Sequence, residues 1–302
     1  MKKPRWLYWL EFLPVAAVLP LISLLPHGLG LVLSRGIGNL AYLLVGTYRR
    51  VAQINLQLAF GDRLTLPQQK TAARESFVNA AQTFFELTRL YRYDRDQIVR
   101  HTLEPEGYER YRKALARGRG VIAVSGHFGN WYWPVICAAM EGFTVNIIVR
   151  PLDNPLLDRL MRRVFERWGV RVIPRRQSVL AALTALRRGE TVALMVDQNA
   201  HMHGRFVPFF GVQASTMQGL PILRRGSGAE VVAIHSRRMK EGHHITTRWL
   251  EGLPEEAEEC LTGVNQHLET VIDSDPGQYF WLHPRWKKRP PGKPSLYPGL
   301  RV

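Results

Sequence analysis

A histidine at the end of an apolar run is the first residue of this chain that could act as a base. His127 follows Gly120-Val121-Ile122-Ala123-Val124, and a short apolar run bounded by glycine is typical of a buried strand. Open α/β sheets place ligands and reactive groups at the ends of such strands. A neutral imidazole there can take a proton from a hydroxyl group, and a carboxylate usually orients it. The alternative is a buried histidine that bonds only to backbone.

A second polar cluster, Asp197-Gln198-Asn199, follows the apolar residues 191–196, so it is also expected at a strand end. It could belong to a site or form a simple turn stabilised by its own side chains. A third segment, Arg205-Phe206-Val207-Pro208-Phe209-Phe210-Gly211, places apolar side chains in what we interpret as a loop. This segment could cover an apolar ligand, although packing in the core is the simpler interpretation.

The elements that would position these residues alternate along the chain. We predict strands at 121–125, 144–149, 170–173 and 191–196, separated by helices that end near 140, 168 and 188. Such alternation favours parallel crossover units and an α/β fold with a mixed or parallel sheet flanked by helices. Further strands are expected at 230–236 and 244–250, a long helix at 255–272, and helical structure throughout 55–91.

The N-terminal residues have the composition of a membrane anchor. Residues 6–25 are apolar and aromatic apart from Glu11, Pro14, Pro20 and Ser23, and they follow a basic start. Trp6 and Trp9 near that start are typical of the membrane interface, which argues against a cleaved signal. Two prolines and a carboxylate leave open whether the helix spans the bilayer or lies in its interface. A buried core helix is the remaining alternative. We therefore predict an anchor in 1–50, a helical region in 51–99, and an α/β domain with a basic tail in 100–302.

Charge and cysteine content limit the possible partners. A formal net charge of +16 indicates an anionic partner such as nucleic acid, an acidic protein or a lipid surface. Ten arginines lie between 150 and 188, and residues 285–301 carry six basic side chains and no acidic one. We do not expect nucleic acid as the partner, because no nucleic-acid-binding signature accompanies this charge. Cys137 and Cys260 lack zinc or redox spacing, which predicts buried thiols.

Metal and nucleotide chemistry find no support in the motifs. His201 and His203, and the pair His243-His244, have no third ligand at a recognisable spacing, so we predict no metal site. The chain has no G-x-S-x-G elbow and no glycine-rich phosphate loop.

Five separated motifs together resemble one known family. They are Gly126-His127-Phe128-Gly129-Asn130-Trp131, Arg150-Pro151-Leu152-Asp153-Asn154-Pro155, Asp197-Gln198, Val207-Pro208-Phe209-Phe210-Gly211 with Thr216, and Gln278-Tyr279-Phe280-Trp281-Leu282-His283-Pro284-Arg285-Trp286-Lys287. In this order they resemble the lipid A biosynthesis acyltransferases. The resemblance implies a glycerolipid-acyltransferase-like α/β domain on the cytoplasmic side of the bacterial inner membrane, attached by the N-terminal segment. It also implies an acyl carrier protein thioester as donor, an anionic lipid acceptor and no cofactor.

The family motif H-x4-D/E is incomplete here, because Tyr132 stands where the carboxylate belongs. Loss of the acid that orients a catalytic histidine can cost about 10⁴-fold in turnover. Either Asp197 from a neighbouring strand end or the Tyr132 hydroxyl could replace it. The alternative is a relative that binds lipid or acyl carrier protein without transfer.

On this resemblance we assign His127 as the general base, supported by Asp197 or Tyr132. The backbone near Gly129 and Asn130 would stabilise the oxyanion, and Arg150 would bind a phosphate of acceptor or donor. The remaining substrate-binding candidates are Gln198, Arg205, Phe209 and Phe210, which would line the site or its acyl groove, and Arg285 and Lys287, which would bind lipid headgroups.

Overall fold

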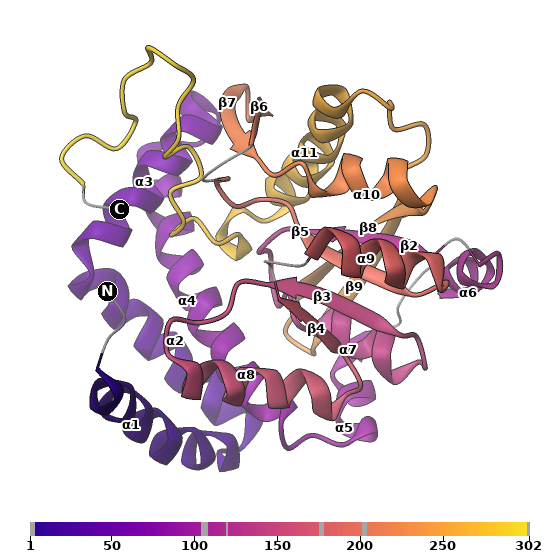
Figure 1. The fold of residues 1–302 in the computed structure, drawn as a ribbon. Coiled ribbons are helices and arrows are strands. Elements are labelled where there is room, and N and C mark those ends of the chain that lie inside the picture. The colour runs from indigo at the N-terminus through magenta and orange to yellow at the C-terminus, as the bar shows by residue number, and fades with distance from the viewer. Residues whose placement is uncertain (1–3, 104–107, 119, 175–177, 201–203, 301–302) are drawn as a thin grey trace.

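Seven strands form one mixed sheet at the centre of the molecule (Figure 1). The computed structural model describes residues 4–103, 108–118, 120–174, 178–200 and 204–300. The strand order is β1-β9-β8-β2-β5-β3-β4. The strands are β1 (Thr102–Leu103), β2 (Val121–Ser125), β3 (Val145–Val149), β4 (Arg171–Pro174), β5 (Thr191–Met195), β8 (Glu230–Arg238) and β9 (His243–Trp249).

The predicted α/β fold is confirmed. The central strands β8, β2, β5, β3 and β4 run parallel, and within this sheet the β8–β9 pair is the antiparallel one. Helices α7 (Trp133–Met140), α8 (Pro155–Arg167) and α9 (Ser178–Arg187) provide the crossover connections that parallel strands need. Helices α5 (Arg95–Arg100), α6 (Tyr108–Ala116), α10 (Gly219–Ser227) and α11 (Ala257–Ser274) complete the layers beside the sheet.

The helical region before the sheet is broken where we expected one helix over 55–91. Helix α3 (Gly46–Phe60) ends at Gly61, whose φ of +49° leaves the helical region, and a short 3₁₀ turn (Gly61–Arg63) follows. Helix α4 (Leu66–Leu90) then begins at a capping box, in which Thr65 and Gln68 satisfy each other's backbone N–H groups.

Helices α3 and α4 share a core with the sheet. Val51, Leu56 and Phe77 belong to the same buried cluster as Ile122 and Val124 of β2. Residues 51–99 therefore pack as part of the sheet domain, and the division at residues 50 and 99 stays a prediction. Cys137 and Cys260 are both free and buried, as predicted.

The segment 205–211 is a β-hairpin and not the loop that we expected. Strand β6 (Arg205–Phe209) pairs antiparallel with β7 (Val212–Thr216). Phe210 and Gly211, both with positive φ, form the turn between them. Val207 and Phe209 are buried on one face, as the two-residue repeat of a strand requires. The nearly continuous apolar composition had concealed this alternation.

Helices α1 (Arg5–Leu24) and α2 (His27–Leu44) precede α3 at the edge of the molecule (Figure 1). Among the described residues, α1 is long and apolar enough to cross a bilayer, and α2 would qualify only together with α3, across a bend of 91°. Helix α1 is therefore a candidate membrane anchor.

Candidate active site

The sheet brings His127 and Asp197 together at its carboxyl edge. Strands β2 and β5 are parallel neighbours, and Ser125 lies opposite Met195 at their ends. His127 and Asp197 each lie two residues beyond this last pair, so the two side chains leave the same edge side by side. The two strand ends that the sequence indicated separately therefore form one site.

The carboxylate of Asp197 holds the histidine through two contacts. His127 Nδ1 lies 2.8 Å from Asp197 Oδ1, and the backbone N–H of His127 donates to Oδ2 at 2.7 Å. With Nδ1–H donated to the carboxylate, Nε2 carries the free lone pair that a general base needs. The amide nitrogen of Gln198 lies 3.4 Å from this Nε2. The His127 side chain is 15% exposed and that of Asp197 is 3% exposed, so the base is accessible and its partner is not.

The surroundings of Asp197 keep it ionised. Burial would raise the pKa of this carboxyl, but the charge of His127, two hydrogen bonds from His127 and the charge of His283 lower the pKa to about 2. Burial, then the charge of Asp197 and a side-chain hydrogen bond with it, raise the pKa of the neighbouring Tyr279 hydroxyl well above its usual value. The motif that contains Tyr279 was recognised in the sequence, but this role was not.

Tyr132 points away from the histidine. Its ring packs 5.7 Å from that of Phe165 and 5.5 Å from that of Trp131, and burial raises the pKa of its hydroxyl. Because both ring nitrogens of His127 face Asp197 and Gln198, Tyr132 does not hold the imidazole. Of the two replacements for the motif carboxylate, the geometry supports Asp197.

Gly129 serves the backbone and not a ligand. Its φ is +56°, and a Cβ at this position would lie 1.7 Å from the carbonyl oxygen of Ser236. Its N–H donates to the carbonyl of Gln278 at 3.0 Å. This particular N–H is therefore used inside the fold, and the wider expectation that backbone donors near Gly129 and Asn130 stabilise an oxyanion stays a prediction.

Asn130 is fully buried and holds the turn after the histidine. Its side-chain oxygen accepts the backbone N–H groups of Tyr132 and Trp133 at 3.1 and 3.2 Å, and its nitrogen donates to Glu86 at 2.8 Å. The side-chain groups of Asn130 are therefore used inside the protein, and a substrate-binding role for its backbone stays a prediction.

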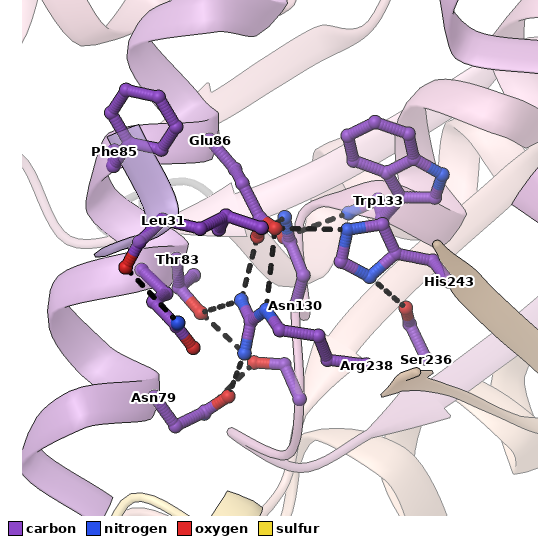
Figure 2. A network of polar contacts seen from close by, with 12 residues as sticks. Leu31, Asn79, Thr83, Phe85, Glu86, Asn130, Trp133, Ser236, Arg238 and His243 are labelled. Carbon is purple, nitrogen blue, oxygen red and sulfur yellow. Dashed lines mark hydrogen bonds and ion pairs between the residues drawn. The ribbon is translucent and has the colours of Figure 1, made fainter. Parts of the chain in front are cut away.

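A buried polar network centred on Glu86 supports this turn (Figure 2). Glu86 on α4 pairs with Arg238 at 2.6 Å and with His243 at 3.2 Å, and the ring of Trp133 lies 4.3 Å from that of His243. Burial would raise the pKa of Glu86, but the charges of Arg238 and His243 lower it. Arg238 also bonds to Asn79. The sequence analysis missed this network, whose one local signal is a glutamate between apolar residues of α4.

Two of the predicted substrate-binding residues are exposed and free to meet a ligand. Arg150 directly follows β3 at the same sheet edge as His127, and its side chain is 67% exposed, with a contact of 3.4 Å to Asp153. Lys287 is exposed in the C-terminal segment. Arg205 is exposed as well, but it already pairs with Glu258 at 2.9 Å.

The aromatic and buried candidates belong to the core. Arg285 is 2% exposed and donates to the Ser215 carbonyl and to Thr216 Oγ1, at 2.7 and 2.6 Å. Phe209 is fully buried. Neither side chain reaches the surface, so the structure lends no support to the expected contacts of Arg285 with lipid and of Phe209 with an acyl chain, which stay predictions. Phe210 is half-buried beside Phe60.

Histidine clusters do not build a metal centre in the described part of the chain, where no group of three or more His, Cys, Asp or Glu side chains has suitable geometry. His243 is bonded to Glu86, and His201 and His203 lie outside the described residues.

A histidine with a buried carboxylate behind it, at the carboxyl edge of an α/β sheet, is typical of enzymes that deprotonate a hydroxyl group. Comparison with known proteins identifies the chemistry. The family model described as bacterial lipid A biosynthesis acyltransferase matches residues 2–288. The chain belongs to this family and is an acyltransferase, which confirms the resemblance.

Several characterised relatives cover almost the whole chain. The lipid A biosynthesis lauroyltransferase of Escherichia coli (strain K12) is 31% identical over 96% of this chain and 95% of its own. The palmitoleoyltransferase of the same organism is 29% identical over 96% and 95%. Its myristoyltransferase is 25% identical over 98% and 92%.

Proposed function

We propose that this acyltransferase moves a fatty acyl chain from an acyl carrier protein thioester to a hydroxyl group of a lipid A precursor. The names of the relatives support a lipid A acceptor. The thioester donor follows from the family resemblance. We also propose that the protein works at the cytoplasmic face of the bacterial inner membrane, attached through its N-terminal helices, because the family resemblance implies that side and α1 has an apolar surface.

In the proposed reaction His127 Nε2 removes the proton of the acceptor hydroxyl as the oxygen attacks the thioester carbonyl. Asp197 stabilises the imidazolium that forms. The tetrahedral intermediate then breaks its carbon–sulfur bond, and the leaving thiolate takes the proton back from His127. The new ester bond and the free thiol are the products, so neither an oxidant nor a metal is consumed.

Gln198 is the residue best placed to assist the developing charge. Its amide nitrogen lies 3.4 Å from His127 Nε2, next to the position of the reacting oxygen. We assign it to orient the substrate or to stabilise the oxyanion, a contribution typically of a few kcal/mol. It would act beside the backbone donors that we expect near Gly129 and Asn130.

The charged rim of the site suits phosphate groups. Arg150 is the main candidate to bind a phosphate of the acceptor or of the donor's phosphopantetheine, because it is exposed at the same sheet edge and its guanidinium matches phosphate geometry. Lys287 would add charge toward lipid headgroups. Arg205 is the weaker candidate because Glu258 already compensates its charge. Phe210 would lie at the apolar groove.

Tyr132 raised the alternative of a relative that binds lipid or acyl carrier protein without transfer. One observation favours an active enzyme: Asp197 contacts both the imidazole and the backbone of His127, so the base keeps a carboxylate partner.

Membranes that contain the protein provide the test. The membranes are incubated with a radiolabelled acyl carrier protein thioester and a lipid A precursor. The lipid products are then separated, and their masses are measured by mass spectrometry. We expect a product heavier by one acyl group with the wild type and with Lys113→Ala, an exposed control on α6, but not with His127→Ala. Transfer by His127→Ala at the wild-type rate, or no transfer by the wild type to any offered precursor, would contradict the proposal.

A further inference from the structure

Helix α1 has two distinct faces along its whole length. The outer face is exposed and apolar, and the inner face is partly or fully covered by the rest of the protein. Exposed side chains on the outer face are Trp6, Trp9, Leu10, Leu13, Leu21 and Leu24. Partly or fully covered positions recur with helical spacing at 7, 8, 11, 12, 15, 16, 19, 22 and 23. The inner face therefore follows the protein surface from one end of the helix to the other, beside α8 and α4.

Both ends of α1 are bonded to the folded domain. Near the beginning, Asn154 donates to the Tyr8 carbonyl at 2.9 Å and to Glu11 Oε2 at 3.0 Å. Near the end, Arg89 on α4 donates to the Ser23 carbonyl at 3.4 Å. Since an α-helix rises about 1.5 Å per residue, these two attachments lie roughly 22 Å apart along α1.

This arrangement conflicts with a helix that crosses a membrane. The hydrocarbon region of a bilayer is about 30 Å thick, so the two ends of a spanning helix lie near opposite surfaces. Asn154 and Arg89 belong to one folded domain. If α1 crossed the bilayer, these two residues would have to lie near opposite membrane surfaces, and the domain that holds them would have to pass through the lipid. The carboxylate of Glu11, which would be costly inside a bilayer, instead faces Asn154.

We infer that α1 lies in the plane of the membrane, with its outer face inserted in one leaflet, and does not cross the bilayer. Figure 1 shows α1 lying along the edge of the molecule, next to α8. This inference rests on the proposed membrane attachment and specifies its form. The tryptophans near the basic beginning of α1 are the side chains that favour the boundary between headgroups and acyl chains.

Helix α2 extends the same kind of surface. Its outer face exposes Leu29, Val32, Leu33, Ile37 and Leu40. Its inner face uses small residues to approach α4 closely, and Gly38 leaves so little room that a Cβ would lie 2.6 Å from the backbone of Val78. Arg5 begins α1, Arg49 and Arg50 lie near the beginning of α3 just after α2, and the whole chain carries a net charge of +16. An apolar face with basic ends fits a leaflet that contains anionic lipid.

The sidedness of two introduced cysteines tests the inference in the full-length protein. Arg5→Cys marks the beginning of α1 and Lys113→Cys marks the domain, while the natural cysteines are buried. A thiol reagent that cannot cross membranes is applied to intact spheroplasts and to disrupted ones. We expect both positions to be protected in intact cells and labelled at least tenfold more after disruption. Labelling of one position but not the other in intact cells would overturn the inference.

The depth of the outer face provides a second measurement. A fluorophore at Leu13→Cys or at Leu24→Cys is quenched by spin-labelled lipids in vesicles of phosphatidylethanolamine and phosphatidylglycerol. An in-plane helix places both labels at a similar shallow depth, whereas a spanning helix places the first near the bilayer centre and the second near a surface. Recovery of the protein in the soluble fraction, as a monomer or as a cross-linkable dimer, would also overturn the inference. Acyl transfer measured on the same vesicles reports separately on the chemistry.

Discussion

Replacing Asp197 with asparagine tests the assignment of this residue as the partner of the base. The carboxylate accepts the imidazole N–H with one oxygen and the His127 backbone N–H with the other. Asparagine keeps the shape but has one oxygen and one donor group. If its oxygen stays with the backbone, its NH₂ group faces Nδ1, which favours the tautomer with hydrogen on Nε2. That tautomer cannot take a proton from a hydroxyl group.

The structure sets the scale of the expected loss. The pKa of Asp197 is lowered from 3.8 to about 2 in spite of burial. A shift of nearly two pKa units, at about 1.4 kcal/mol each, stabilises the charged carboxylate by roughly 2.5 kcal/mol. If this attraction is realised in the transition state, its loss lowers the rate by a factor of some tens, which sets the small end of the expected range. In the serine protease triad, replacing the orienting aspartate with asparagine leaves the histidine in the wrong tautomer and lowers turnover by about 10⁴-fold.

The assay is the turnover number of purified protein in detergent, with saturating acyl donor and lipid acceptor. We expect Asp197→Asn to lose between about 30-fold and 10⁴-fold in turnover. Asp96→Asn, an exposed change on α5, serves as the control and should keep wild-type turnover. Circular dichroism checks that both variants are folded. A folded Asp197→Asn enzyme within threefold of the wild type would refute the role of this carboxylate.

Four further outcomes follow from the same contacts. Tyr132→Phe should keep turnover within about threefold, because the hydroxyl does not hold the base, and a loss beyond tenfold in the transfer assay would contradict this. Tyr279→Phe should lower kcat roughly tenfold with little change in KM, because it removes a hydrogen bond to the charged partner of the base; an effect on KM alone in steady-state kinetics would argue against such positioning. Glu86→Ala should lower the free energy of unfolding in urea by about 3–5 kcal/mol, because Arg238 is left buried without its partner, and a change below 1 kcal/mol would disprove the network's role. Because the folded-state pKa of Asp197 is lowered to about 2, the ionised carboxylate stabilises the fold above about pH 4, and this stabilisation is lost as the pH falls toward 2. Between pH 5 and pH 3, the free energy of unfolding in urea should therefore fall less for Asp197→Asn than for the wild type.

The strands, and the two residues at their ends, could be predicted because the signal is local. Apolar runs bounded by glycine predict buried strands, and polar residues after them predict a sheet-edge site. The contact between His127 and Asp197 depends on strand order, which is not local. Strand β5 lies between β2 and β3, although β3 follows β2 in the chain. Asp197 could therefore be suggested as a partner, but only the sheet order brings it to 2.8 Å from His127.

The sequence was least informative where residue type concealed burial. Arg285 belongs to a basic run, so its charge indicated a surface role, yet hydrogen bonds from its two terminal nitrogens to Ser215 and Thr216 hold it inside the protein. The Glu86 network was missed for a related reason. Arg238 is 152 positions away from Glu86 in the chain, and such a pair leaves no periodic pattern. Tertiary packing decides both cases.

A double-mutant cycle tests the central claim most directly, namely that His127 is the base and that Asp197 acts through it. Turnover is measured for His127→Ala, for Asp197→Ala and for the double variant, with the same donor and acceptor. If the two residues act as one unit, the double variant should be no slower than His127→Ala alone. Losses that multiply in the double variant would show that the two residues act independently and would contradict the account.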